Sequence, residues 1–150
     1  MMSFLTRIYR KYFCSRPKRL LLELFDSVPE AKSGIVLEEI GLPNGTVTTY
    51  RWWKTDRVAF FFKAHAPSLA GEAVSDALVE DTKKRFDELL SIVKRLDQPA
   101  LRNHSGSIRD GVLFSIAWGS EKNLRDLTIR NPEPRSRYIK LVRELKENAW

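Results

Sequence analysis

The chain has 150 residues, of which 43% are hydrophobic and 30% charged, and it contains one cysteine, Cys14. This size and composition fit a single domain, residues 1–150, that buries its own core, and they argue against a disordered chain. A lone cysteine excludes an internal disulfide and favours a reducing, cytoplasmic location. No apolar run approaches the roughly 20 residues that span a bilayer, so an integral membrane protein is not expected.

The net charge of +7 is concentrated at one end of the sequence. Residues 1–22 carry six basic side chains and no acidic one, whereas the rest of the chain carries 20 basic and 19 acidic side chains. The high isoelectric point is therefore a property of the N-terminal segment. Its basic residues are Arg7, Arg10, Lys11, Arg16, Lys18 and Arg19.

Apolar residues in the same segment recur at spacings of one, three and four, which predicts a basic amphipathic helical segment over about residues 3–25. Arginine interrupts the apolar residues too often for a signal peptide. Cations beside aromatic rings suit an anionic membrane surface or a nucleic-acid backbone. The alternative is a terminal helix that packs its apolar stripe on the domain and solvates its charges. The stripe consists of Phe4, Leu5, Ile8, Tyr9, Tyr12 and Phe13.

The periodicity changes to that of strands after Gly34. SGIVLEEIGL and TVTTYRWW flank Pro43-Asn44-Gly45, and Asn-Gly between two β-rich runs predicts a hairpin. A second turn at residues 54–57 leads to VAFFFKA, so we expect a three-stranded meander. With two-residue loops, Ile40 would face Thr49, and Glu38 would face Arg51 as a cross-strand charge pair. A tight turn centred on residues 55–56 would likewise set Trp53 opposite Val58.

Strand alternation divides the aromatic residues of this meander between two faces. We assign the first, richer face to the core. Tyr50, Trp52 and Phe61 on the second face then become candidates for a second covered layer or an exposed patch. The first face carries Val36, Ile40, Val47, Trp53, Val58, Phe60 and Phe62, and the second carries Leu37, Tyr50, Trp52, Ala59 and Phe61.

The rest of the chain alternates helices with strands. The segment HAPSLAGEAVS is interpreted as a connection, and a long helix is predicted from about Ser75 to Leu96. VLFSIAWG and NLRDLTIR are predicted to pair as strands, and residues 136–150 to form a closing helix. The order helix, three strands, helix, two strands, helix indicates an α+β fold, an antiparallel sheet of about five strands packed by helices.

The C-terminal part reads RDGVLFSIAWG, a short turn, LTIRNPEP and then RYIKLVREL. Over residues 108–147 it resembles small bacterial proteins of the polymorphic-toxin immunity kind. Those proteins have a DG turn that opens an aromatic-rich strand, a second strand, a proline-bearing loop and a terminal helix. The resemblance implies a stoichiometric binder that blocks a cognate toxin, and no family binding residue carries over to this sequence.

No catalytic or cofactor motif is found in the sequence. His104, Ser105, Ser107 and Asp110 share one loop, but no G-x-S-x-G elbow accompanies them, so we interpret the stretch as a plain loop. Two histidines and one cysteine offer few zinc ligands, and no glycine-rich phosphate-binding motif occurs. We therefore expect no enzymatic activity, no cofactor and no metal.

These observations favour a non-enzymatic protein-binding module, an immunity-type inhibitor of a bacterial toxin. Interfaces draw disproportionately on Trp, Tyr and Arg. The alternative is binding of nucleic acid or of an anionic membrane through the basic N-terminal segment, and an enzyme that uses the 102–110 loop ranks last. The predicted partner-binding residues are Tyr50, Arg51, Trp52, Trp53 and Phe61.

Overall fold

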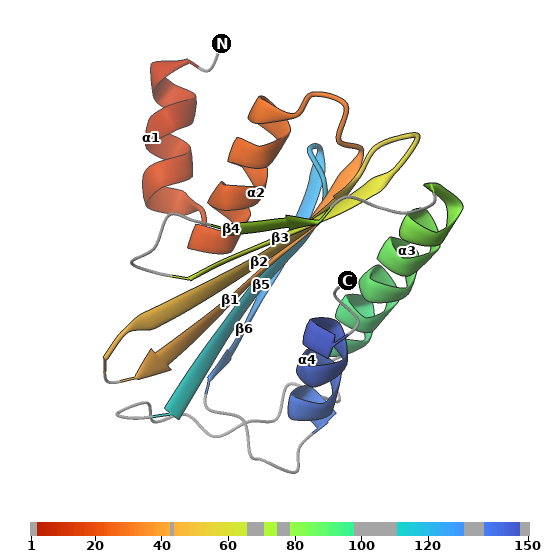
Figure 1. Cartoon of the computed structure of the whole chain (residues 1–150). Coiled ribbons are helices and arrows are strands. Elements are labelled where there is room, and N and C mark those ends of the chain that lie inside the picture. The colour runs from red at the N-terminus through yellow and green to blue at the C-terminus, as the bar shows by residue number, and fades with distance from the viewer. Residues whose placement is uncertain are drawn as a thin grey trace.

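The computed structural model describes residues 3–42, 44–65, 71–74, 79–97, 111–130 and 137–147. Figure 1 shows the helices and strands of this part of the chain. In chain order they are α1 (Phe4–Phe13), α2 (Arg16–Ser27), β1 (Ser33–Leu42), β2 (Thr46–Lys54), β3 (Ala59–His65), β4 (Gly71–Val74), α3 (Val79–Leu96), β5 (Gly111–Ser120), β6 (Asn123–Arg130) and α4 (Arg137–Glu147).

The strands form one antiparallel sheet in the order β4-β3-β2-β1-β5-β6. The expected α+β fold, with helices packed on an antiparallel sheet, is confirmed. Strand β4 lies within the segment interpreted as a connection, so the described sheet has six strands instead of about five. Strand β1 pairs with both β2 and β5, which joins the meander to the C-terminal hairpin.

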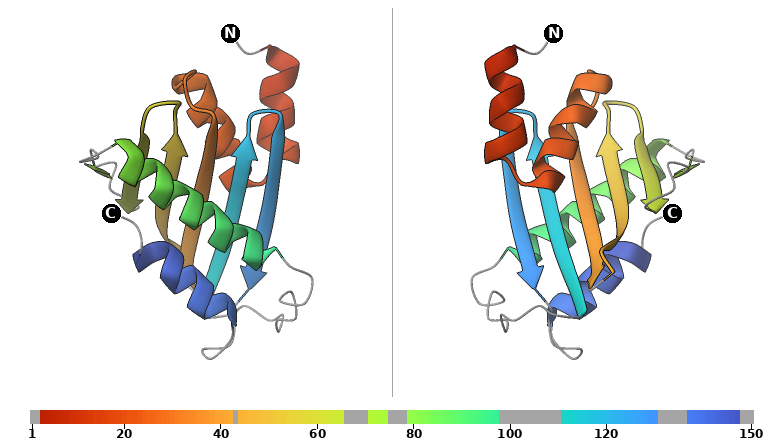
Figure 2. Two further views of the ribbon diagram at one scale, coloured as in Figure 1. Left: turned by 90° about the vertical axis from the view of Figure 1, so that its right-hand side faces the viewer. Right: turned by 90° about the vertical axis from the view of Figure 1, so that its left-hand side faces the viewer.

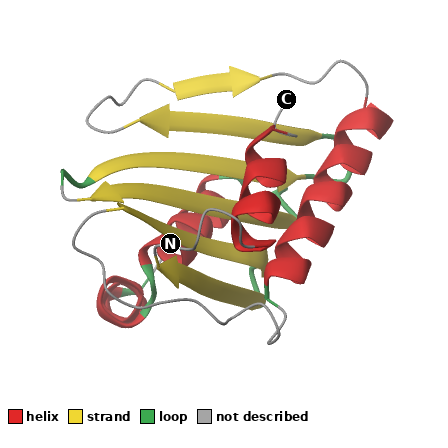
Figure 3. Cartoon of the chain, turned by 90° about the horizontal axis from the view of Figure 1, so that it is seen from below, coloured by secondary structure: helices red, strands yellow, loops and turns green. Residues whose placement is uncertain are grey.

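Helices lie on both sides of the sheet. Helices α3 and α4 cover one face, while α1 and α2 stand on the opposite side (Figure 2). Seen from below, α3 and α4 lie next to each other over the sheet (Figure 3). We call the face under α3 and α4 the inner face and the face under α2 the outer face.

The observed register differs from the expected one by two residues at both turns of the meander. Ile40 lies opposite Val47, and Trp53 lies opposite Phe60. The second turn is closed by the Thr55 amide, which donates to the Val58 carbonyl at 2.8 Å. Because side chains alternate with a period of two, a two-residue shift leaves every side chain on its predicted face.

The larger core lies on the inner face, so the assignment of the core to the first face of the meander was wrong. Helices α3 and α4 bring their apolar stripes to the second face, whereas α2 packs on the first. Strand alternation identifies which side chains share a face but carries no signal for which face the helices choose. The fully buried members of this core include Leu37, Trp52, Phe86, Leu89, Ile116 and Leu145.

A smaller cluster holds α2 on the outer face. Leu21, Leu24 and Phe25 of the helix pack on Val36 and Ala117 of the sheet. The Ser15 side chain caps the helix by accepting from the Lys18 amide at 3.4 Å, and a proline follows in the first turn. The predicted N-terminal segment is therefore two helices, separated at residues 14–15.

Glycine at position 34 permits this contact between α2 and β1. A Cβ atom there would lie 2.6 Å from Leu21 Cδ1 and 3.3 Å from the Trp52 carbonyl oxygen. The first of these separations is shorter than side-chain carbons tolerate without a shift in the packing. Gly34 therefore sets how closely α2 approaches the sheet.

Candidate functional site

Three of the five predicted partner-binding residues face the inner core. Tyr50, Trp52 and Phe61 are 6%, 0% and 4% exposed, and their rings pack against one another with centroids 5.4–6.4 Å apart. They belong to the covered layer beneath α3 and α4, not to an exposed patch. Their placement corrects the prediction that they lie ready for a partner, because helices occupy that face.

The other two predicted residues lie together on the outer face. Trp53 is half-buried, and its ring stacks on Phe60 with centroids 5.4 Å apart. Arg51 is half-buried as well, and its guanidinium carbon lies 5.2 Å from the centroid of the Phe62 ring. Arg51 Nε is buried and has no hydrogen-bond partner in the described part of the chain. We call Arg51, Trp53, Phe60 and Phe62 the Trp53 surface.

A cavity of about 390 Å³, here called the apolar pocket, opens beside this surface. Its apolar lining comes from Val28 after α2 and from Val58 and Phe60 around the β2–β3 turn. Lys32 and Asp56 also line it, and they pair with 3.9 Å between Nζ and Oδ2. Segments that are about thirty residues apart in the sequence thus form one hollow with an apolar floor and a charged rim.

Local hydrogen bonds set the walls of the apolar pocket. Thr55 Oγ1 accepts from the amides of Arg57 and Val58 at 3.2 Å each, which tightens the β2–β3 turn. The Lys32 amide donates to the Lys54 carbonyl at 2.8 Å and ties the segment after α2 to β2. Of these features, the sequence predicted only the turn at residues 54–57. The pocket itself was missed because its second wall comes from the segment between α2 and β1.

A buried carboxylate lies farther along the outer face. Glu38 is 1% exposed, and Arg16 Nε donates to its Oε1 at 3.0 Å. Burial raises the pKa of Glu38 above its ordinary value, although the positive charges of Arg16, Arg19 and Arg51 act in the opposite direction. The expected cross-strand partner Arg51 is therefore one of three guanidinium groups around this carboxylate, and Thr49 lies directly opposite Glu38.

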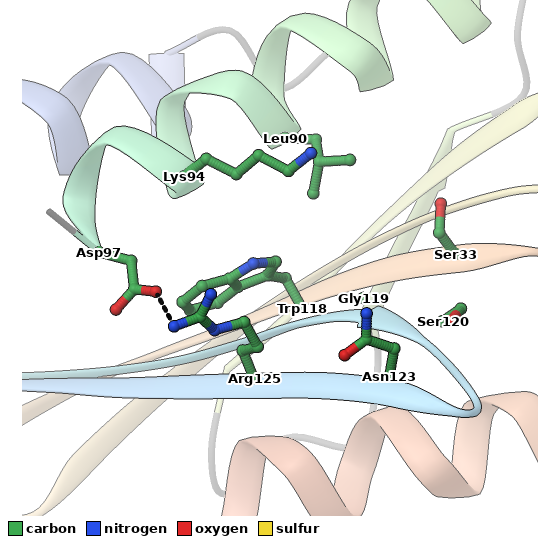
Figure 4. A pocket seen from close by; sticks show the side chains of 9 residues that line it. All are labelled: Ser33, Leu90, Lys94, Asp97, Trp118, Gly119, Ser120, Asn123 and Arg125. Atoms are coloured by element: carbon green, nitrogen blue, oxygen red, sulfur yellow. Dashed lines mark ion pairs between the residues drawn. The ribbon is translucent and has the colours of Figure 1, made fainter.

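A second cavity, the polar pocket, lies between the end of α3 and the β5–β6 hairpin and has a volume of about 510 Å³. Leu90, Lys94 and Asp97 line it from the helical side, and Trp118 and Arg125 line it from the sheet (Figure 4). The dashed line in Figure 4 marks the ion pair in which Arg125 Nη2 lies 3.0 Å from Asp97 Oδ2.

The described lining of the polar pocket is charged and polar. Its Arg125 and Asp97 pair with each other, and Lys94 adds a further cation. The buried Ser33 hydroxyl, also in the lining, has no hydrogen-bond partner in the described structure.

The basic residues of the N-terminal segment divide between α1 and α2. Arg7 is exposed on α1, whereas Lys18 and Arg19 are half-buried on α2 and Arg16 pairs with Glu38. Arg10 and Lys11 belong to α1, but their side chains lie outside the described part. Apolar residues of α1 are exposed to solvent beside Arg7, with exposed fractions of 75% for Phe4, 77% for Leu5 and 56% for Tyr9.

The histidine–serine loop, residues 102–110 with His104, Ser105, Ser107 and Asp110, lies outside the described residues. Within the described ranges no group of three or more His, Cys, Asp or Glu residues is arranged to hold a metal ion. The same residues contain no helix with the length and apolar character needed to cross a membrane.

Comparisons with models of protein families, with curated proteins and with solved structures give no match for this chain.

Proposed function

We propose that this protein is a non-enzymatic protein-binding module of the immunity type, a cytoplasmic inhibitor that binds a cognate bacterial toxin and blocks it. The observation that supports this proposal best is the Trp53 surface beside the apolar pocket. Two predicted partner-binding residues, Arg51 and Trp53, lie on it. The hairpin of β5 and β6 followed by α4, which spans most of residues 108–147, favours a toxin as the class of partner.

The composition of this region suits a protein interface. Anchor residues at interfaces are enriched in Trp, Tyr and Arg and insert into apolar hollows that a polar rim shields from water. Here an apolar floor of Val28, Val58 and Phe60 is bordered by the ion pair of Lys32 and Asp56, which come from the two segments that line the pocket. An apolar side chain of the toxin would enter the pocket, and charged groups around that side chain would pair with the rim.

The half-buried guanidinium of Arg51 adds a directional contact. Its guanidinium carbon lies 5.2 Å from the centroid of the Phe62 ring, so a positive charge borders the aromatic side chains of this surface. Arginine pairs strongly with carboxylates through charge-assisted hydrogen bonds. The toxin surface is accordingly expected to place a carboxylate or a backbone carbonyl near Arg51.

The test uses the full chain and the purified protein that the neighbouring gene encodes. Its affinity for the wild type is compared by calorimetry with that for the double variant Lys32→Glu, Arg57→Glu, which reverses two charges at the rim of the pocket. We expect a one-to-one complex that persists at high salt and an affinity loss of about tenfold or more in the variant.

The matched control is Lys122→Glu, Arg130→Glu, which reverses two exposed charges on the β5–β6 hairpin and produces the same net charge. This variant should bind like the wild type, and thermal melting should show that both variants fold. Absence of any complex with the folded wild type would reject the inhibitor proposal. Equal losses in both variants would reject the pocket as the binding site.

A further inference from the structure

Helix α1 differs from the other helices in what it does with its apolar residues. Helices α2, α3 and α4 bury their apolar side chains on the sheet. On α1, Phe4 and Leu5 are 75% and 77% exposed. Figures 1 and 2 show α1 beside α2, on the side of the sheet away from α3 and α4. A terminal helix that packs its apolar stripe on the domain would bury Phe4 and Leu5, and both are exposed.

The charge of the sequence segment that contains this exposed apolar surface has one sign. Residues 1–22 carry six basic side chains and no acidic one, and the remaining 128 residues are nearly balanced. Arg7 on α1 is exposed next to Ile8. A surface that is complementary to α1 must therefore be both negatively charged and able to take up apolar side chains.

We propose that α1 lies in the interface of an anionic lipid membrane, with Phe4 and Leu5 entering the acyl boundary and the cations of α1 contacting lipid phosphates. A short amphipathic helix with basic residues on its polar side has the properties of an interfacial helix. At ten residues, α1 is about half the length needed to cross the hydrocarbon core, so it lies on the membrane and does not span it.

Two other partners fit these observations less well. Nucleic acid would satisfy the cations, but the aliphatic side chain of Leu5 has no π face to stack on a base. A second copy of the chain would cover the apolar residues but would bring two wholly basic segments together, which is electrostatically unfavourable. The anionic membrane meets both requirements. This inference concerns a different surface from the Trp53 surface and does not depend on the toxin.

The experiment is flotation of the full-length protein with vesicles of phosphatidylcholine alone or mixed with phosphatidylserine. We expect binding to the mixed vesicles, and weaker binding at high salt, because ions screen the attraction between exposed charges. The variant Phe4→Ser, Leu5→Ser should reduce the bound fraction about tenfold, because the interface no longer takes up its apolar side chains. Both positions are exposed, so this variant should fold.

Two charge variants separate α1 from the net charge of the protein. Arg7→Gln, Arg10→Gln, Lys11→Gln removes three cations from α1, and Lys122→Gln, Lys140→Gln, Arg143→Gln removes three exposed cations elsewhere. The first should lose binding and the second should keep it. Equal effects of the two variants, or no flotation of the wild type, would overturn the proposal.

The two rival partners give distinct results. Salt-sensitive binding of a single-stranded DNA probe that Phe4→Ser, Leu5→Ser leaves unchanged, without vesicle binding, would assign α1 to nucleic acid. A wild-type dimer in sedimentation equilibrium that this variant converts to a monomer would assign α1 to self-association. Either result would overturn the membrane proposal, and neither would bear on the complex with the toxin.

Discussion

The inner and outer faces of the sheet use the same strands but bury their side chains differently. Two helices cover the inner face, and its large aromatic and aliphatic residues are almost fully buried. One helix, α2, holds the outer face, where a buried carboxylate, a half-buried Arg51 and the apolar pocket lie. We infer that the inner face supplies most of the stability and that the outer face has retained the groups suited to binding.

Adjacent tryptophans provide a direct comparison, because Trp52 is 0% exposed on the inner face and Trp53 is half-buried on the outer face. Trp52→Ala should lower the free energy of unfolding by about 3–5 kcal/mol, since it leaves a cavity in the core. Trp53→Ala should cost about 1–2 kcal/mol. Urea denaturation of both variants measures the difference, and equal costs would contradict the division between the faces.

The contact between α2 and β1 gives an effect of intermediate size. Gly34→Ala should lower the free energy of unfolding by about 1–3 kcal/mol, because its Cβ would meet Leu21 and the Trp52 carbonyl and overpack the contact. Gly41→Ala is the control on the same strand, where the nearest atom to a Cβ is 3.9 Å away. It should change stability by about 0.5 kcal/mol or less. If Gly34→Ala left the free energy of unfolding unchanged, the packing of α2 on the sheet would have to adjust to the added methyl group without cost.

The smallest expected effect is the pH dependence that Glu38 adds. Burial raises its pKa above the ordinary 4.5, so the native state binds the proton more tightly than the unfolded state does. The contribution of Glu38 to stability is therefore present below pH 4.5 and is lost as the pH rises through the raised native pKa. In the Glu38→Gln variant the side chain does not ionise, so this loss of stability with rising pH is absent. The free energy of unfolding of the variant, compared with that of the wild type, should therefore increase with pH.

Urea denaturation at a series of pH values between 4 and 7 tests this expectation. Glu39→Gln, at the neighbouring position on the inner face, is the control for removal of a carboxylate from β1. In the wild type, Glu39 Oε2 pairs with Lys146 Nζ at 2.8 Å. An advantage of Glu38→Gln that shrinks as the pH rises would mean that attraction to Arg16 and its neighbours outweighs burial.

Much of the local structure was predictable from the sequence. The strand predicted for VLFSIAWG is present, and its alternation places Phe114, Ile116 and Trp118 on one face, where all three are buried in the inner core. The long helix predicted to end at Leu96 is α3, and its helical periodicity places Phe86 and Leu89 on one stripe, where both are fully buried. These signals are reliable because side-chain direction follows from the local backbone geometry of a strand or helix.

The candidate site was predicted only in part, for a physical reason. The aromatic run from Tyr50 to Trp53 was identified as the place to look, but alternation sends Tyr50 and Trp52 to one face and Arg51 and Trp53 to the other. The choice between the faces depends on where the helices pack. The apolar pocket also needs Val28 and Phe60 to meet, and no local pattern records that distant contact.

The sequence by itself determined the order of most elements, the residues that share each face, and the wholly basic character of residues 1–22. These are local or compositional properties, because they depend on neighbouring residues and not on the path of the chain. The tertiary structure decided that α3 and α4 cover the face of Trp52, that α2 leaves a pocket beside Trp53, and that α1 keeps Phe4 and Leu5 exposed. Each of these depends on contacts between elements that are distant in the sequence, where several packings can satisfy the same periodicity.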